Sequence, residues 1–149
     1  MRLNGSRIAM TGRSGTLSQA PVIVWDTAGN VTWTKAVLGR GGNDVELDAA
    51  GNTYLLTGYN NQVSSTTRQD ISIYKFNSTG VQQWKQSYDF GGNDFATKFV
   101  LAAGRLSVIG YNSVNSGYFN WVTFQADALS GTKLWNTSYN SVHCTDTQS

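Results

Sequence analysis

Apolar and polar residues alternate with a period close to two along several short stretches of this chain. The clearest example is Ile71-Ser72-Ile73-Tyr74-Lys75-Phe76. Four strand-like runs lie at residues 95–101, 106–111, 119–125 and 133–139, and residues typical of turns separate them. No stretch has the apolar spacing of a helix over the roughly 11 residues that such a pattern needs. The pattern predicts an all-β chain of short strands.

The strand pattern itself repeats about every fifty residues. Trp33, Trp84 and Trp135 are spaced at intervals of 51 residues, and a turn containing glycine precedes each of them. Gly-Gly-Asn-Asp occurs at residues 41–44 and 91–94, and a glycine-led strand recurs at 5–12, 51–60 and 104–112. Four antiparallel strands in about 50 residues form one blade of a β-propeller. We therefore predict a propeller segment of about three four-stranded antiparallel blades.

The repeat divides the chain into a single array of blades. A partial first blade covers residues 1–40, the second covers 41–90 and the third covers 91–140, and a tail of residues 141–149 follows. The chain opens on what corresponds to a second strand, at residues 7–12. We therefore expect the first blade to lack its inner strand. The tail lies where a further blade would begin, and it carries a candidate for the missing strand.

The middle repeat has the residue pattern of a known family. From Gly41 to Trp84 the chain resembles the SBBP (seven-bladed β-propeller) type of repeat found in bacterial and archaeal surface proteins. The resemblance implies a propeller fold much more than any activity. The chain departs from the pattern in the short spacing from Asp44 to Gly51, which predicts a short inner strand in the middle blade. The matching residues are Asp44, Asp48, Gly51, Asn52, Tyr54, Gly58, Asp70, Gly80 and Trp84.

The ends of the array suggest contact with other copies of the chain. Propeller rings use 4–8 blades, so three blades do not close a ring alone. An open blade leaves backbone groups that pair with another chain. We predict that the tail of one chain completes the first blade of another, which gives a six-bladed ring from two copies or an open filament. The alternative is that these residues are a piece of a longer propeller.

The residues that define the repeat have a structural and a functional interpretation. The recurring aspartates are predicted to cap turns, in preference to forming a ring of carboxylates around a cation. The recurring tryptophans are predicted to pack between adjacent blades, in preference to forming a stacking platform for a ligand. In both cases the structural role is needed in every blade, whereas a catalytic or ligand-binding group is needed only once in the protein. These residues are Asp44, Asp94 and Asp146, and Trp33, Trp84 and Trp135.

One group of aromatic residues does not follow the repeat. Trp121 lies on a third strand close to Tyr118 and Phe119, and it is the better candidate for an exposed aromatic contact. A glycan bound through these residues is the alternative to a purely structural role. His143 and Cys144 are neighbours that point to opposite faces of a strand, so a catalytic or metal-binding role is not favoured.

Four Asn-x-Ser/Thr sequons are possible glycosylation sites if the source modifies secreted proteins. The two in turns, Asn30 and Asn77, are predicted to lie in equivalent exposed turns. About this number of sequons is expected by chance from the abundance of Asn, Ser and Thr. The four are Asn4, Asn30, Asn77 and Asn136.

Composition narrows the function further. The net charge is +2 and the basic residues are scattered singly, which gives no footprint for nucleic acid. No apolar run has the roughly 18 residues of a membrane helix. The chain is therefore predicted to be a non-catalytic extracellular or cell-surface module without a cofactor, acting through protein contacts. The phrase from Asp127 to Trp135 also resembles the docking motif of PQQ-dependent propeller dehydrogenases, which makes a quinoprotein fragment a further alternative.

Overall fold

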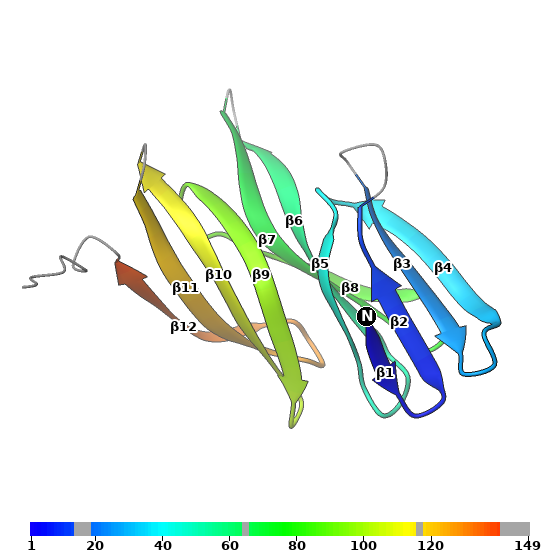
Figure 1. Cartoon of the computed structure of the whole chain (residues 1–149). Helices are drawn as coiled ribbons and strands as arrows, with labels where there is room; N and C mark the ends of the chain where they lie inside the picture. Colours follow the sequence, from blue (N-terminus) through cyan, green and yellow to red (C-terminus); the bar gives the residue numbers. More distant parts are fainter. Residues whose placement is uncertain (14–18, 64–65, 116–117, 141–149) are drawn as a thin grey trace, which may run out of the picture.

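The computed structural model describes the backbone of residues 1–13, 19–63, 66–115 and 118–140, and their side chains apart from those of residues 59–68 and 114–118. These ranges form twelve strands and no helix, arranged in three four-stranded antiparallel sheets (Figure 1). The prediction of an all-β chain of three four-stranded antiparallel blades is confirmed. His143, Cys144 and Asp146 lie outside the described residues, as does the tail of residues 141–149.

Each sheet is built from four strands that follow one another in the chain. The first blade contains β1 (Arg2–Asn4), β2 (Arg7–Thr11), β3 (Gln19–Asp26) and β4 (Val31–Leu38). The second contains β5 (Gly42–Leu47), β6 (Thr53–Val63), β7 (Thr66–Phe76) and β8 (Gln82–Tyr88). The third contains β9 (Asn93–Ala102), β10 (Arg105–Asn115), β11 (Tyr118–Asp127) and β12 (Lys133–Asn140).

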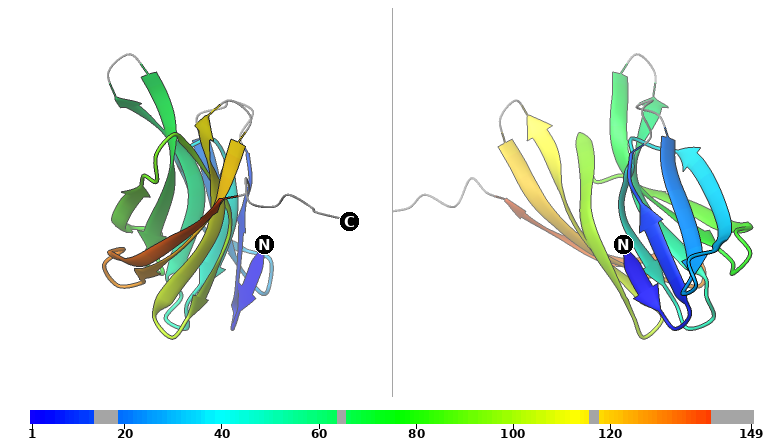
Figure 2. Two further views of the ribbon diagram at one scale, coloured as in Figure 1. Left: turned by 90° about the vertical axis from the view of Figure 1, so that its left-hand side faces the viewer. Right: turned by 45° about the vertical axis from the view of Figure 1, so that its right-hand side comes forward.

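The three sheets stand side by side in chain order, like adjacent blades (Figures 1 and 2). The first strand of each sheet lies at the inner edge, where β5 is next to both β1 and β9. The last strands, β4, β8 and β12, form the opposite edges. No helix long and apolar enough to span a membrane occurs within the described ranges.

The first blade differs from the sequence prediction, because its inner strand is present. The short strand β1 pairs with β2 through Arg2–Ala9, Leu3–Ile8 and Asn4–Arg7. Two contacts with the second blade hold β1 in place. The Arg2 guanidinium forms an ion pair with Glu46 at 2.9 Å, and the Asn4 amide donates to the Leu47 carbonyl at 3.0 Å. A three-residue strand is too short to show an alternating pattern, so this strand could not be predicted from its residues.

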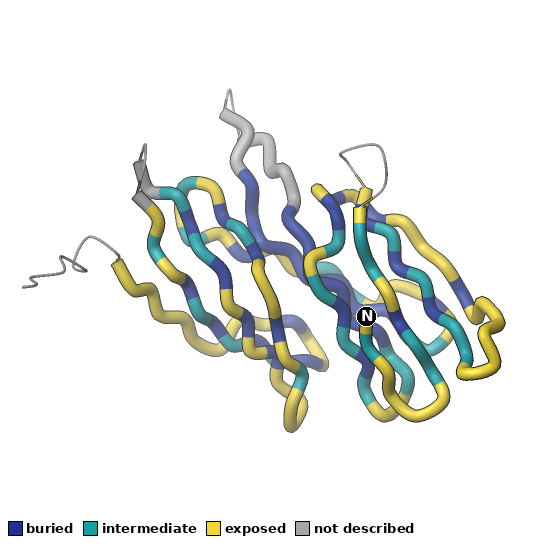
Figure 3. Tube along the Cα trace, in the orientation of Figure 1, coloured by how far each residue is buried: buried dark blue, intermediate teal, exposed yellow. Residues whose placement is uncertain are grey.

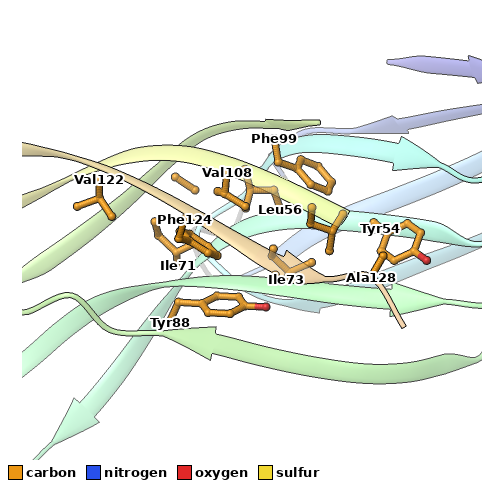
Figure 4. Close-up of a cluster of buried hydrophobic side chains, with 13 residues drawn as sticks. Tyr54, Leu56, Ile71, Ile73, Tyr88, Phe99, Val108, Val122, Phe124 and Ala128 are labelled. Atoms are coloured by element: carbon orange, nitrogen blue, oxygen red, sulfur yellow. The ribbon is translucent and has the colours of Figure 1, made fainter. Parts of the chain in front are cut away.

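The hydrophobic core lies between the blades and not within a single sheet. Buried residues occur in all three sheets (Figure 3). One cluster joins the first and second blades. A second cluster joins the second and third blades (Figure 4). The middle blade is therefore covered on both faces. Adjacent residues Leu55 and Leu56 are both fully buried, because successive side chains on a strand point to opposite faces and each face has a neighbour.

Phe124 should be a main support of the contact between the second and third blades. It is fully buried, and its ring centroid lies 4.6 Å from that of Tyr88 and 5.2 Å from that of Phe90. We expect Phe124→Ala to lower the free energy of unfolding by about 3–5 kcal/mol, measured by urea denaturation. The control Val81→Ala removes an exposed side chain and should change it by less than about 0.5 kcal/mol. Equal losses in the two variants would contradict this placement of the core.

Candidate interaction faces

Adjacent blades are joined by a tryptophan that packs over a glycine. Trp33 on β4 is 8% exposed, and its ring lies over Gly80 in the turn between β7 and β8. A Cβ atom added to Gly80 would lie 2.8 Å from Cδ2 of this ring, which leaves no room for any side chain. The Trp33 ring also packs against Phe76 of the second blade, with ring centroids 5.6 Å apart. We call this contact the Trp–Gly joint.

The same joint connects the second blade to the third. Trp84 on β8 is half-buried and lies over Gly131, where an added Cβ atom would be 3.1 Å from the ring. The Tyr88 hydroxyl strengthens this contact by donating to the Gly131 carbonyl at 2.7 Å. Each joint thus pairs the outer strand of one blade with the last turn of the next.

These last turns share one geometry, which presents the glycine to the tryptophan. Each turn begins with a side-chain oxygen that accepts backbone N–H groups inside the turn. Asp26 Oδ1 accepts from Ala28 at 3.0 Å, and Asn77 Oδ1 accepts from Thr79 at 3.0 Å. Asp127 Oδ1 accepts from Leu129 at 2.9 Å. Gly29, Gly80 and Gly131 all have positive φ, a conformation that strongly favours glycine.

The third blade also has a tryptophan at the joint position, but in the described part of the chain no glycine turn of a further blade lies beneath it. Trp135 pairs with Gln125 at the same register as Trp84 with Lys75 and Trp33 with Val24, each just outside a β-bulge. Trp135 therefore lies on the face of the third blade that points away from the second. It is 47% exposed, against 8% for Trp33. Every residue of β12 is exposed, which Figure 3 shows along the whole strand.

An aromatic row extends over this same uncovered face. The Phe95 and Tyr111 rings are stacked with centroids 4.9 Å apart, and Tyr111 meets Phe119 and Trp121 edge-on at 5.5 and 6.2 Å. Trp121 is 52% exposed and pairs with Tyr139 on β12. The side chain of Tyr118 lies outside those described. Sequence reasoning found Trp121 and Phe119 but missed Phe95 and Tyr111, which join them only through strand register.

The equivalent register positions in the other two blades are buried against a neighbour. The pair Trp121–Tyr139 corresponds to Ile71–Tyr88 in the second blade, whose side chains are 0% and 5% exposed. A shallow apolar hollow of about 180 Å³ lies beside the aromatic row, and Val100, Ile109 and Thr123 are among the residues that line it. The outward face of the third blade thus has the character of an internal interface.

The outward face of the first blade is apolar as well. Leu3 is 67% exposed, whereas Leu47, at the same position on β5, is buried. Met10 is 41% exposed, whereas its register equivalents Leu55 and Val108 are buried. A Cβ atom added to Gly29 would have no atom of the described residues within 4 Å, so no ring from these residues covers this glycine. The apolar side chains of this face are Leu3, Ile8, Met10, Pro21, Ile23 and Trp25.

The recurring aspartates do not share one role in the structure. Asp94 Oδ2 accepts from the Phe90 amide at 2.8 Å within the turn before β9. Asp44 instead reaches the next blade, where its Oδ2 accepts from the Phe99 amide at 3.3 Å. We expected the recurring aspartates to accept a hydrogen bond from the backbone N–H two residues ahead. In the Gly91-Gly92 turn a different residue does this, since Asp89 Oδ1 accepts from the Gly91 amide at 2.8 Å.

Three carboxylates lie together near that turn. Asp70, Asp89 and Asp94 each offer an oxygen within 4.8 Å of the others, which is a spacing that a cation could bridge. Oxygens of Asp89 and Asp94 already accept backbone N–H groups of the turn, so the cluster has a structural role.

The two sequons in turns lie in corresponding turns but at different positions within them. Asn77 is the first residue of its turn and Asn30 the last residue of the corresponding turn, so their amide groups have different surroundings. Asn77 is half-buried and accepts turn N–H groups, whereas Asn30 is exposed and donates to Asp26 at 3.0 Å. Asn136 is exposed on β12, and the Asn4 amide is bonded to the second blade as described above.

A side chain added to the glycine of a Trp–Gly joint should lower the free energy of unfolding more than one added to a turn glycine that no ring covers. Gly80 and Gly104 both have positive φ, but only Gly80 has a ring within contact distance. We expect Gly104→Ala to lower the free energy of unfolding by about 1–2 kcal/mol from backbone strain. Gly80→Ala should lose a further 1–3 kcal/mol or so from overpacking against Trp33. Both values are measured by urea denaturation. Equal losses in the two variants would contradict the close packing of Trp33 on Gly80.

The turn before Gly131 should weaken on acidification. The Ser130 amide donates to the Asp127 carboxylate and, with the Leu129 amide and Arg105, lowers its pKa below 3.8. A lowered pKa stabilises the fold above the unfolded-state value, and this contribution is lost as the pH falls through the folded-state value. We expect Asp127→Asn, which mimics Asn77, to keep its urea midpoint at pH 7 and to lose less than wild type at pH 3. Asp127→Ala should already be less stable at pH 7.

Comparison with models of protein families finds no match to the chain, and comparison with curated proteins also finds none. The resemblance of residues 41–84 to the SBBP type of repeat therefore remains a prediction based on its residues.

Proposed function

We propose that this chain is a non-catalytic structural module that acts through protein–protein contacts and associates with copies of itself. The observation that carries the proposal is the apolar character of both outward faces, at register positions that are buried wherever a neighbouring blade is present. Exposed apolar patches of this kind are typical of interaction surfaces.

Face-to-face contact supports self-association better than exchange of a strand. Strand complementation requires an empty place beside β2, but β1 already pairs along Arg7–Ala9. Only Met10 and Thr11 remain for an added strand at that edge. Packing of whole faces has the larger surface available. An extracellular or cell-surface location fits the composition and the SBBP resemblance, and it is part of the same proposal.

A glycan-binding module is the second candidate. Its support is the aromatic row of Phe95, Tyr111, Phe119 and Trp121, since exposed aromatic rings stack on apolar faces of ligands. The two candidates use the same face of the third blade. A blade packed there would cover the row, so the two functions compete for it.

Self-association is tested by the mass in solution. We expect sedimentation equilibrium to show a mass above that of the 16.2 kDa chain, rising with concentration, and Trp121→Ser to weaken the association at least tenfold. Val81→Ser, which changes an exposed residue of the middle blade, is the matched control. A monomer at all concentrations would overturn the proposal. If that monomer also binds a glycan array through Trp121, the second candidate takes its place.

A further inference from the structure

The two outward faces carry the two halves of one Trp–Gly joint. The third blade supplies an exposed tryptophan, Trp135, and the first blade supplies an uncovered glycine, Gly29. The turn around Gly29 has the same first-residue capping as the turns around Gly80 and Gly131. Both halves of the joint are thus present in every copy, on opposite ends of the array.

We propose that Trp135 of one copy packs over Gly29 of a second copy, so that the third blade of the first continues directly into the first blade of the second. This inference rests on the proposed function, because it requires the outward faces to be contact surfaces. It specifies the partner as a second copy of this chain, and it specifies the register in which the copies meet.

Polar contacts of the internal joints have counterparts at the ends. Across the first joint, Arg7 donates to the Ser78 carbonyl at 2.5 Å. Arg105 occupies the same position in the third blade, because it pairs with Asp127 as Arg7 pairs with Asp26. In the joint between copies, Arg105 lies where it can donate to the carbonyl of Thr27, the residue that corresponds to Ser78.

Apolar contacts match in the same way. Each internal interface buries side chains of both facing sheets, such as Tyr88 of the second blade against Phe124 of the third. On the outward face of the third blade, Tyr139 occupies the register position of Tyr88. On the outward face of the first blade, Ile23 occupies the register position of Phe124. Both are apolar or aromatic, as the register of an internal joint requires.

The joint between copies is head-to-tail, so the two faces of one copy remain available for two neighbours. Such an interface closes into a ring if the rotation allows it, and otherwise extends as a filament. Two copies give six blades, which is within the range of 4–8 blades that propeller rings use. The mass in solution separates these forms.

The experiment uses two variants that damage opposite ends. Trp135→Ser removes the tryptophan and leaves Gly29 intact. Gly29→Asn fills the glycine position with a residue that tolerates positive φ, and leaves Trp135 intact. Circular dichroism and urea denaturation check that both variants fold. Leu129→Ala, which shortens an 80% exposed side chain in a turn, is the matched control.

We expect the association of each variant alone to weaken by about 30-fold or more, as is usual when an aromatic hot-spot contact is lost. An equimolar mixture should regain association and stop at a pair of chains, because one intact joint can form between Gly29→Asn and Trp135→Ser. Leu129→Ala should behave as wild type. Sedimentation velocity measures these four samples and the wild-type chain.

The outcomes separate this inference from the proposed function. A wild-type chain that is monomeric overturns both. A wild-type chain that associates while the two variants associate equally well overturns the Trp135–Gly29 joint alone. Association that is lost in only one variant, with no recovery on mixing, indicates like faces packing on each other and also overturns the head-to-tail joint.

Discussion

The packing of a tryptophan ring onto a bare glycine backbone is the contact on which this architecture depends. A four-stranded sheet cannot bury both of its faces by itself, so its stability comes from the sheets beside it. The ring of Trp33 or Trp84 reaches across that gap at the outer edge, while the inner strands meet at the other edge. Between these two lines of contact the apolar side chains of both sheets fill the core. Glycine at the receiving position is required twice, for the backbone conformation and for the space that the ring occupies.

Much of the architecture could be predicted from the sequence because the repeat makes each signal appear two or three times. The spacing of the three tryptophans and the glycine-led turns gave the number of sheets and their four-stranded form. The short spacing between Asp44 and Gly51 also predicted that β5 is shorter than β9, and the two strands have 6 and 10 residues. Local turn chemistry and strand periodicity are properties of adjacent residues, which is why they can be read from one chain.

Other features depend on contacts between distant residues and were therefore missed or misassigned. In the strand β1, Arg2 and Asn4 contact the second blade, and nothing in residues 1–4 alone shows these contacts. Asp44 and Asp94 look equivalent in the sequence, yet one binds the next blade and the other its own turn. The aromatic row required the register that places Phe95 beside Tyr111 and Tyr111 beside Trp121. The sequence therefore predicted Trp121 and Phe119 of this face but not Phe95 and Tyr111.

The burial of the middle sheet on both sides affects how freely the sequence can vary. All eight residues from 69 to 76 are buried, so no position in this run of β7 faces solvent. A strand with one solvent-exposed face accepts polar replacements at every second residue, but this run has no such position. Tolerance of substitution should therefore increase from the centre of the molecule towards its two ends. Random mutagenesis should therefore leave residues 69–76 of β7 nearly unchanged among the variants that still fold.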